Sequence, residues 1–237
     1  MLERTLIRSF GFLILFLGFS AVLAAENKSY LHSNVDLVKT PPEWVLIADS
    51  HQIRTFKASI PGEDTLLFRG ITEFSAPPAA ITSVAFSPKY RKMWVDRIDS
   101  GRVVARESDV KWLELSVFNP PWPFKQREFV VQAMIEYLEA EKKLIISGKS
   151  VESELAPVAP DRVRGVIYYC GFAIRKTATG CEVEVMAATD TKGNIPLWVV
   201  NLIQKSWPRN TLEGIRRIYE SEKSNLEIDP KFTAFFN

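Results

Sequence analysis

A run of six strand-like segments followed by one long helical segment limits what the second half of this chain can fold into. These strand-like segments are rich in β-branched and aromatic residues, are separated by turn signals, and cover residues 102–107, 110–118, 128–138, 144–152, 163–174 and 181–189. Consecutive strands joined by short connections pair with their neighbours, so the run predicts an antiparallel meander. From Ile195 the apolar residues recur at helical spacing, which predicts a long C-terminal helix. Pro208 removes a backbone hydrogen bond and predicts a kink or short break in that helix.

The preceding part of the chain predicts shorter elements. Residues 43–48 follow two prolines and indicate a short helix. Residues 53–60 and 65–74 indicate two strands around a turn. The segment 77–94 lacks strand alternation and contains two internal prolines, which indicates two short helices. The chain is therefore expected to belong to the α+β class.

Composition excludes several classes of protein. The chain has 237 residues, of which 46% are hydrophobic and 24% charged, as in a soluble domain with a sizeable core. A formal charge of +2 gives no electrostatic argument for binding nucleic acid. His32 and His51 are the two histidines, too few for a persuasive metal site, and no cofactor is expected. The sequence also lacks a nucleophile elbow, a phosphate loop and an HExxH motif.

The N-terminus reads as an export signal. Arg4 and Arg8 precede an uncharged apolar stretch that ends in small residues around Ala24. This predicts a signal peptide over residues 1–24, followed by a polar linker over 25–40. The alternative is an uncleaved anchor, but the stretch would rise only about 25 Å as a helix, against a hydrocarbon core of about 30 Å. The mature protein is expected in the periplasm or the extracellular space.

The two cysteines are predicted to stay apart. If Lys176 and Cys181 flank a hairpin turn, Cys170 lies opposite Ala187, far beyond disulfide reach from Cys181. Two buried free thiols are therefore expected, even in an oxidising compartment.

Alternation along two neighbouring strands suggests which faces look inward. One face of residues 128–138 is wholly apolar. On the preceding strand Trp112, Glu114, Ser116 and Phe118 share a face, where a carboxylate and a hydroxyl are unusual for a core. Such a sheet and helix can pack solidly, or enclose an apolar cavity with a few polar groups. In the first case Glu114 and Ser116 face solvent and nothing binds.

Two stretches resemble motifs of one known family. Residues 118–130 read F-N-P-P-W-P-F-K-Q-R-E-F-V, and residues 190–201 read D-T-K-G-N-I-P-L-W-V-V-N. They resemble the "WP…R-D-F-V" and "D-x-x-G-x-I-P-x-W-L-V-N" motifs of START domains, the steroidogenic-acute-regulatory-related lipid-transfer family, with Glu128 where Asp is usual. The resemblance, with its surrounding elements, covers residues 41–223 and leaves 224–237 as a C-terminal tail.

The resemblance implies a helix-grip fold, a curved antiparallel sheet wrapped around the long C-terminal helix and enclosing a tunnel. It also implies a non-enzymatic carrier that binds one lipid or sterol-like molecule and touches membrane surfaces transiently. A monomer is expected, although the sequence does not determine the oligomeric state. Two alternatives stay open. One is an enzyme of the wider helix-grip superfamily, of the cyclase or hydrolase type, acting on a small hydrophobic substrate. The other is a ligand-free scaffold whose cavity is filled by its own side chains.

A ligand enclosed in this way would contact inward residues of the sheet and the terminal helix. The predicted contact residues are Trp112, Glu114, Phe129, Val131, Ala133, Leu144, Ile167, Tyr169, Val199, Leu202 and Ile203. Trp122 and Phe124, in the proline-rich loop, are predicted to form a membrane or gate loop. The alternative is that these two aromatic residues cover the end of the barrel and never meet a bilayer.

The resemblance also implies roles for a few further residues. In sterol-binding relatives a carboxylate and an arginine face each other at the positions of Glu114 and Ala133, so here the carboxylate has lost its partner. Glu114 is then expected either to hydrogen-bond a ligand hydroxyl or ammonium group, or to be protonated by burial. Arg127 is expected to anchor the loop through its five fixed donors rather than contact ligand. Gly193 and Pro196 are expected to shape the start of the terminal helix.

Overall fold

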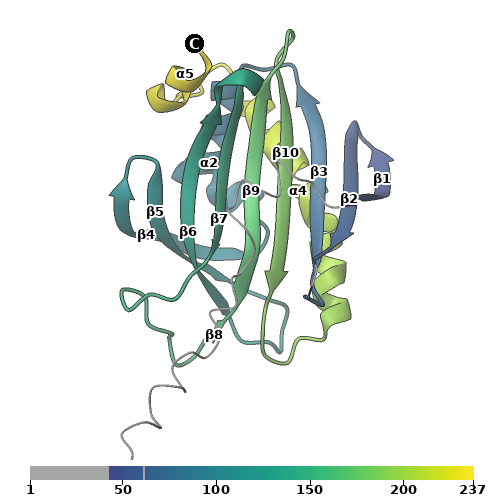
Figure 1. The fold of residues 1–237 in the computed structure, drawn as a ribbon, viewed down its shortest axis with the longest axis vertical. Helices are drawn as coiled ribbons and strands as arrows, with labels where there is room; N and C mark the ends of the chain where they lie inside the picture. The colour runs from purple at the N-terminus through teal and green to yellow at the C-terminus, as the bar shows by residue number, and fades with distance from the viewer. Residues whose placement is uncertain (1–42, 61) are drawn as a thin grey trace, which may run out of the picture. The chain divides into compact units, whose positions relative to one another are not determined.

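An antiparallel sheet organises residues 43–60 and 62–237, the part of the chain that the computed structural model describes (Figure 1). Its strands follow the order β1-β2-β3-β10-β9-β7-β6-β5-β4, and a short strand, β8, pairs with β6 in parallel. The strands are β1 (Val45–Ser50), β2 (Ile53–Ser59), β3 (Leu66–Phe74), β4 (Ile98–Ser108), β5 (Lys111–Phe118), β6 (Arg127–Leu138), β7 (Lys143–Ser150), β8 (Val163–Arg164), β9 (Val166–Lys176) and β10 (Cys181–Asp190). The predicted signal peptide and linker lie outside the described residues.

The predicted meander is confirmed as β4, β5, β6, β7, β9 and β10, and β10 then pairs with β3. The expected register also holds, since Cys170 lies opposite Ala187 and Lys176 opposite Cys181. The strand expected over 163–174 divides into β8 and β9. The first residues of this segment, β8, run alongside β6, and the Val163 amide donates to the Gln126 carbonyl. Strand β9 instead pairs with β7 and β10.

The helix predicted over residues 43–48 is wrong, because this segment forms the edge strand β1. A two-residue turn at His51 and Gln52 joins β1 to β2, and both residues have positive φ, 55° and 62°. Two positive φ values are the signature of the type I′ hairpin turn, which usually contains Asn and Gly. His-Gln does not carry that signal, so the hairpin was not recognisable from the sequence.

The helices lie on one side of the sheet. The two short helices predicted after β3 are confirmed as α2 (Pro78–Phe86) and α3 (Pro88–Trp94). The long helix α4 (Leu197–Glu222) is also confirmed and continues through Pro208 without a break. The segment expected to be a C-terminal tail contains a further helix, α5 (Pro230–Phe236), and the 3-10 turn η1 (Glu139–Glu141) joins β6 to β7.

The main core lies between the sheet and the C-terminal half of α4. Leu212, Ile215 and Ile218 of α4 are almost fully buried and belong to one cluster with apolar residues of α2, α5, β7, β9 and β10. The N-terminal half of α4 differs, since Trp198 and Leu202 are 70% and 63% exposed. The C-terminal half of α4 therefore packs closely against the sheet, whereas its N-terminal half packs less closely. The predicted helix-grip arrangement of a curved sheet around a long terminal helix is confirmed.

Candidate functional site

A cavity of about 860 Å³ lies between the sheet, the helices α2 and α3, and the N-terminal half of α4. Its lining is mostly apolar and comes from β5, β6, β7, β9 and β10 on the sheet side. The helices contribute Phe86, Trp94, Val200, Ile203 and Trp207. The volume falls in the range of about 300–1,000 Å³ that is typical of small-molecule sites.

Seven of the predicted contact residues line this cavity: Trp112, Glu114, Phe129, Val131, Ala133, Ile167 and Ile203. The five on β5 and β6 come together because alternate residues of a strand share a face, and these strands pair with Trp112 opposite Ala133 and Glu114 opposite Val131. Ile167 comes from β9 and Ile203 from α4.

The other four predicted contact residues do not line the cavity. Leu144 is fully buried in the main core, Leu202 points away on the exposed face of α4, and Val199 is half-buried outside the lining. Tyr169 faces the opposite side of the sheet, where it packs with Leu67 and Met186. A register shift between β9 and β10 explains this, because Tyr169 pairs with Ala188 and Ile167 with the next residue, Thr189. Tyr168 is therefore the extra residue of a β-bulge, which places Ile167 and Tyr169 on opposite faces of the sheet.

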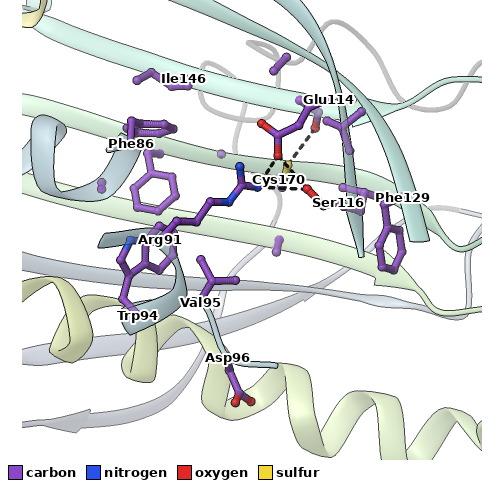
Figure 2. Close-up of a pocket in the computed structure, with 18 of the residues that line it drawn as sticks. Phe86, Arg91, Trp94, Val95, Asp96, Glu114, Ser116, Phe129, Ile146 and Cys170 are labelled. Carbon is purple, nitrogen blue, oxygen red and sulfur yellow. Dashed lines mark hydrogen bonds and ion pairs between the residues drawn. The ribbon is translucent and has the colours of Figure 1, made fainter. Parts of the chain in front are cut away.

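A polar cluster on one wall of the cavity consists of Arg91, Glu114 and Ser116 (Figure 2). Arg91 on α3 reaches across to β5, where its Nη2 forms an ion pair with the Glu114 carboxylate and donates to Ser116 Oγ at 3.1 Å. The Ser116 hydroxyl donates to Glu114 Oε1 at 2.7 Å. The side chains of Arg91 and Glu114 are 34% and 17% exposed, so the pair is largely but not fully removed from water.

Arg91 supplies the positive charge that position 133 lacks. The sequence predicts that Glu114 meets a ligand or is protonated, and nothing in it indicates Arg91 as the partner. The arginine comes from a different element, more than twenty residues earlier in the chain. Lys89 and Lys92 flank it on the same short helix, so no local pattern singles it out.

Cys170 also faces the cavity, from β9 beside the polar cluster (Figure 2). Its Sγ lies 3.6 Å from the Gly148 carbonyl oxygen, and burial raises the pKa of the thiol to about 12. Burial likewise raises the pKa of the Cys181 thiol to about 12, in the main core. Both cysteines are free, as predicted, although Cys170 is half-buried rather than fully buried.

The residues of the first motif fix the loop between β5 and β6. Arg127 is 2% exposed and donates to the backbone carbonyls of Lys125, Thr191 and Lys192, so its expected anchoring role is confirmed. Arg127 also lines the cavity. Burial lowers the pKa of this guanidinium from its ordinary value.

Glu128, the next motif residue, is buried on the other face of β6. Its Oε1 accepts from Arg164 Nη2 at 2.7 Å and from the Ala159 amide at 3.3 Å, and its Oε2 lies 3.6 Å from Arg162 Nη1. It therefore holds the segment between β7 and β8 against the sheet.

The second motif prepares the start of α4. Gly193 has φ of +69°, a conformation that glycine adopts without strain, and an ideal Cβ there would lie 3.3 Å from Arg127 Nη2. Pro196 is the N-cap residue of α4. Neither lines the cavity, in agreement with the expected shaping role.

The predicted gate residues lie outside the cavity. Trp122 is 92% exposed, and Phe124 lies against Arg127, whose guanidinium carbon is 5.8 Å from the ring centroid. Their neighbours Pro120 and Pro121 do line the cavity, together with Ile195 near the start of α4. The 119–124 loop and the start of α4 therefore border the same end of the cavity.

Metal-binding clusters and membrane-spanning helices are two further features that bear on function. In the described ranges, no group of three or more His, Cys, Asp or Glu side chains is placed to hold a metal ion. Among the helices of residues 43–237, none is long and apolar enough to cross a bilayer. His51 lies in the β1–β2 turn, outside the cavity lining, with Nδ1 2.8 Å from Arg209 Nη2.

Relatives of this chain occur in bacteria and in mammals. A Pseudomonas aeruginosa protein described as uncharacterized is 23% identical over 179 residues, 75% of this chain and 87% of that protein. START domain-containing protein 10 of human and mouse is 28% identical over 130 residues, 53% of this chain. That match spans 43% of the mammalian protein's length.

Solved structures share the fold. Human STARD10 aligns with a TM-score of 0.69 and 20% identity over 83% of this chain and 84% of that one. Human StAR-related lipid transfer protein 5 gives 0.73 and 14%, over 80% and 92% of the two chains. A STAR-related lipid transfer protein from Xanthomonas axonopodis gives 0.65 and 19%, over 75% and 98%.

The family model for the START domain matches residues 32–217, which include the sheet, most of the cavity lining and most of α4. This chain belongs to the START domain family.

Proposed function

We propose that this protein binds a single lipid or sterol-like molecule in its internal cavity and carries or presents it between membranes. The observation that carries the proposal is the cavity of about 860 Å³ under the N-terminal half of α4. Its apolar walls supply binding energy of about 25 cal/mol for each Å² of apolar surface removed from water. The polar cluster of Arg91, Glu114 and Ser116 offers both a donor and an acceptor to a polar group of the ligand.

The proposal includes a carrier role without catalysis. Burial holds the Cys170 thiol in its neutral form at ordinary pH, and Glu114 is already engaged by Arg91. Neither group has an adjacent histidine in the lining of the cavity, which the general acid–base chemistry of a cyclase or hydrolase commonly uses.

Transient membrane contact is proposed at the end of the cavity bordered by the 119–124 loop. The exposed side chains of Trp122, Trp198 and Leu202 lie in that loop and on the first turns of α4. Tryptophan favours the membrane–water interface, so this end suits the passage of an apolar ligand. We further propose that the protein is exported, that its signal peptide is cleaved near Ala24, and that the mature protein acts as a monomer. N-terminal sequencing of the exported protein tests the cleavage.

Native mass spectrometry of the purified protein tests the proposal. One copurified lipid or sterol-like molecule per chain is expected. Ala133→Trp places a large ring inside the cavity and is expected to abolish retention, whereas Ala140→Trp, at an exposed position of η1, is the matched control. Wild-type protein that carries no ligand and fails to move a labelled phospholipid between vesicles would contradict the carrier role. A small substrate that is turned over would support the enzyme instead.

A further inference from the structure

The helix α5 lies beyond the residues that match the family, yet it forms part of the cavity wall. The match ends at residue 217, whereas α5 begins at Pro230. Lys231 and Phe232 of α5 line the cavity, together with Glu227 and Asp229 of the preceding segment. This chain therefore builds one wall of its cavity from a segment outside the family match.

The helix is held firmly in place. The Asp229 amide donates to Ser83 Oγ of α2 at 3.0 Å, and Lys176 Nζ donates to the Phe236 carbonyl at 2.8 Å. The Asp229 side chain also caps the helix by accepting from the Lys231 amide. Phe232 and Phe236 are 3% and 6% exposed and belong to the main core.

The position of α5 along β6 identifies which end of the cavity it closes. Near the end of β6, Tyr137 packs against Phe235 and Phe236, with ring centroids 5.8 and 5.9 Å apart. Phe129, near the start of β6, lies at the end bordered by the 119–124 loop. Figure 1 shows α5 beside the end of the sheet at which β6 turns into β7. Helix α5 and the loop thus lie at opposite ends.

The distance between the two ends sets the length available to a ligand. Phe129 and Ile135 both line the cavity and are six residues apart on β6, which corresponds to about 20 Å at about 3.3 Å per residue. At the α5 end, the ring of Phe232 lies 6.3 Å from that of Phe86 on α2, and both line the cavity. A linear apolar chain that starts at the loop end would meet this aromatic pair.

We propose that α5 is the end wall of the ligand cavity and that Phe232 limits the length of the apolar ligand that fits. This inference rests on the proposed binding function and deepens it. The favoured ligand class has a linear apolar part that extends along β6 from the loop end to Phe232. Removing the phenyl ring lengthens the space at that end, so longer chains gain affinity while shorter ones do not.

The test measures how saturated fatty acids, from decanoate to arachidate, displace the fluorescent probe 1-anilinonaphthalene-8-sulfonate. In the wild-type protein, affinity is expected to rise with chain length to a maximum and then fall. Phe232→Ala is expected to shift the maximum to longer acids, with a gain of about fourfold for each added methylene that the enlarged cavity buries. Phe235→Ala is the matched control, because Phe235 packs against Tyr137 and does not line the cavity.

Each outcome has a defined meaning. An unchanged maximum in Phe232→Ala, or an equal shift in Phe235→Ala, would overturn the inference and leave the carrier function intact. A wild-type protein that binds neither the probe nor any fatty acid would overturn the carrier function as well. If Phe232→Ala does not fold, as judged by circular dichroism, Phe232→Leu keeps the position apolar, and a smaller shift in the same direction is expected.

Discussion

Gly70 on β3 lies directly against Pro208 on α4. An ideal Cβ on Gly70 would lie 2.8 Å from Pro208 Cβ and 3.1 Å from Leu212 Cδ1. This is closer than side chains tolerate, so the absence of a side chain on Gly70 lets the helix approach the sheet here. The contact lies near the point where α4 changes from lining the cavity, as far as Asn210, to filling the core, from Leu212. The part of α4 that borders the cavity and the part that packs in the core meet near Gly70 and Pro208.

Gly70→Val is therefore expected to destabilise the protein by about 1–3 kcal/mol, the usual cost of overpacking a core. The added methyl groups would push α4 away from β3. Urea unfolding measures the change. Gly101→Ala on β4 is the control, because its nearest neighbour is the flexible end of the Arg91 side chain, at 3.3 Å, and little effect is expected. Equal stability of Gly70→Val and wild type would show that α4 adjusts freely.

Arg91 and Glu114 are expected to stabilise each other by about 1 kcal/mol in a double-mutant cycle of Arg91→Met and Glu114→Gln. The value is modest because the Arg91 side chain is about a third exposed. The exposed pair Arg209 and Glu213, at 2.8 Å, is the control and is expected to give about 0.3–0.5 kcal/mol, as for other i,i+4 pairs. A coupling no larger than in the control would mean that the cavity does not strengthen the pair.

Glu114→Gln also separates a ligand contact from a purely structural role. If the carboxylate accepts a hydrogen bond from a ligand, the substitution is expected to weaken binding of the copurified molecule about tenfold, as expected for a lost hydrogen bond to a charged group. Isothermal titration calorimetry with the delipidated protein measures this. Unchanged affinity would remove Glu114 from the site and leave it as the partner of Arg91 alone.

Most of the sheet could be predicted because its strands carry local signals. Alternation and turn residues located β5, β6 and β10, and the hairpin between β9 and β10 fixed the register of Cys170 opposite Ala187. The two motifs then indicated how the sheet and α4 meet. Five cavity residues on β5 and β6 follow from this, since alternation and one register place them together, whereas Ile167 lies on β9 and Ile203 on α4.

The remaining features depend on contacts that one sequence does not reveal. The bulge opposite Ala188 turned Tyr169 away from the cavity, although its own strand pattern is unremarkable. Arg91 meets Glu114 only because α3 folds over β5. The α5 segment was expected to be a tail because it lies beyond the residues that resemble the family, and its helix is stabilised by tertiary contacts of Phe232 and Phe236.

Stability is expected to fall as the pH rises above 9, in part because of the buried Cys181 thiol. Its pKa is about 12 in the folded protein, against 9.0 ordinarily, so between these values the folded state holds a proton that the unfolded state has lost. Folding stability then decreases by at most about 1.4 kcal/mol per pH unit, and the contribution is complete below pH 9. Urea unfolding at a series of pH values is expected to give a flatter curve for Cys181→Ala. Identical slopes would exclude this thiol as the cause.

Glu128→Ala is expected to cost about 3–5 kcal/mol, as when one partner of a buried ion pair is removed. The carboxylate is 1% exposed and holds Arg164, so its loss leaves that guanidinium without its closest anion. Amide hydrogen exchange is expected to rise in residues 156–164, which Glu128 ties to β6. Glu152→Ala, an exposed carboxylate in the connection between β7 and β8, is the control. Equal exchange in both variants would assign the order of this segment to other contacts.

Trp122→Ala is expected to weaken binding to phospholipid vesicles about tenfold if the 119–124 loop carries the proposed membrane contact, since burying a large apolar side chain contributes about 1.5–3 kcal/mol. Trp122 is 92% exposed, so its removal should leave the unfolding free energy unchanged. Vesicle co-sedimentation measures the binding. Met93→Ala is the control, because Met93 is an exposed apolar residue on α3 and is not part of the loop. Vesicle binding that is insensitive to Trp122→Ala, or equally sensitive to Met93→Ala, would place the membrane contact outside the loop. Trp198→Ala would then test the first turn of α4 by itself.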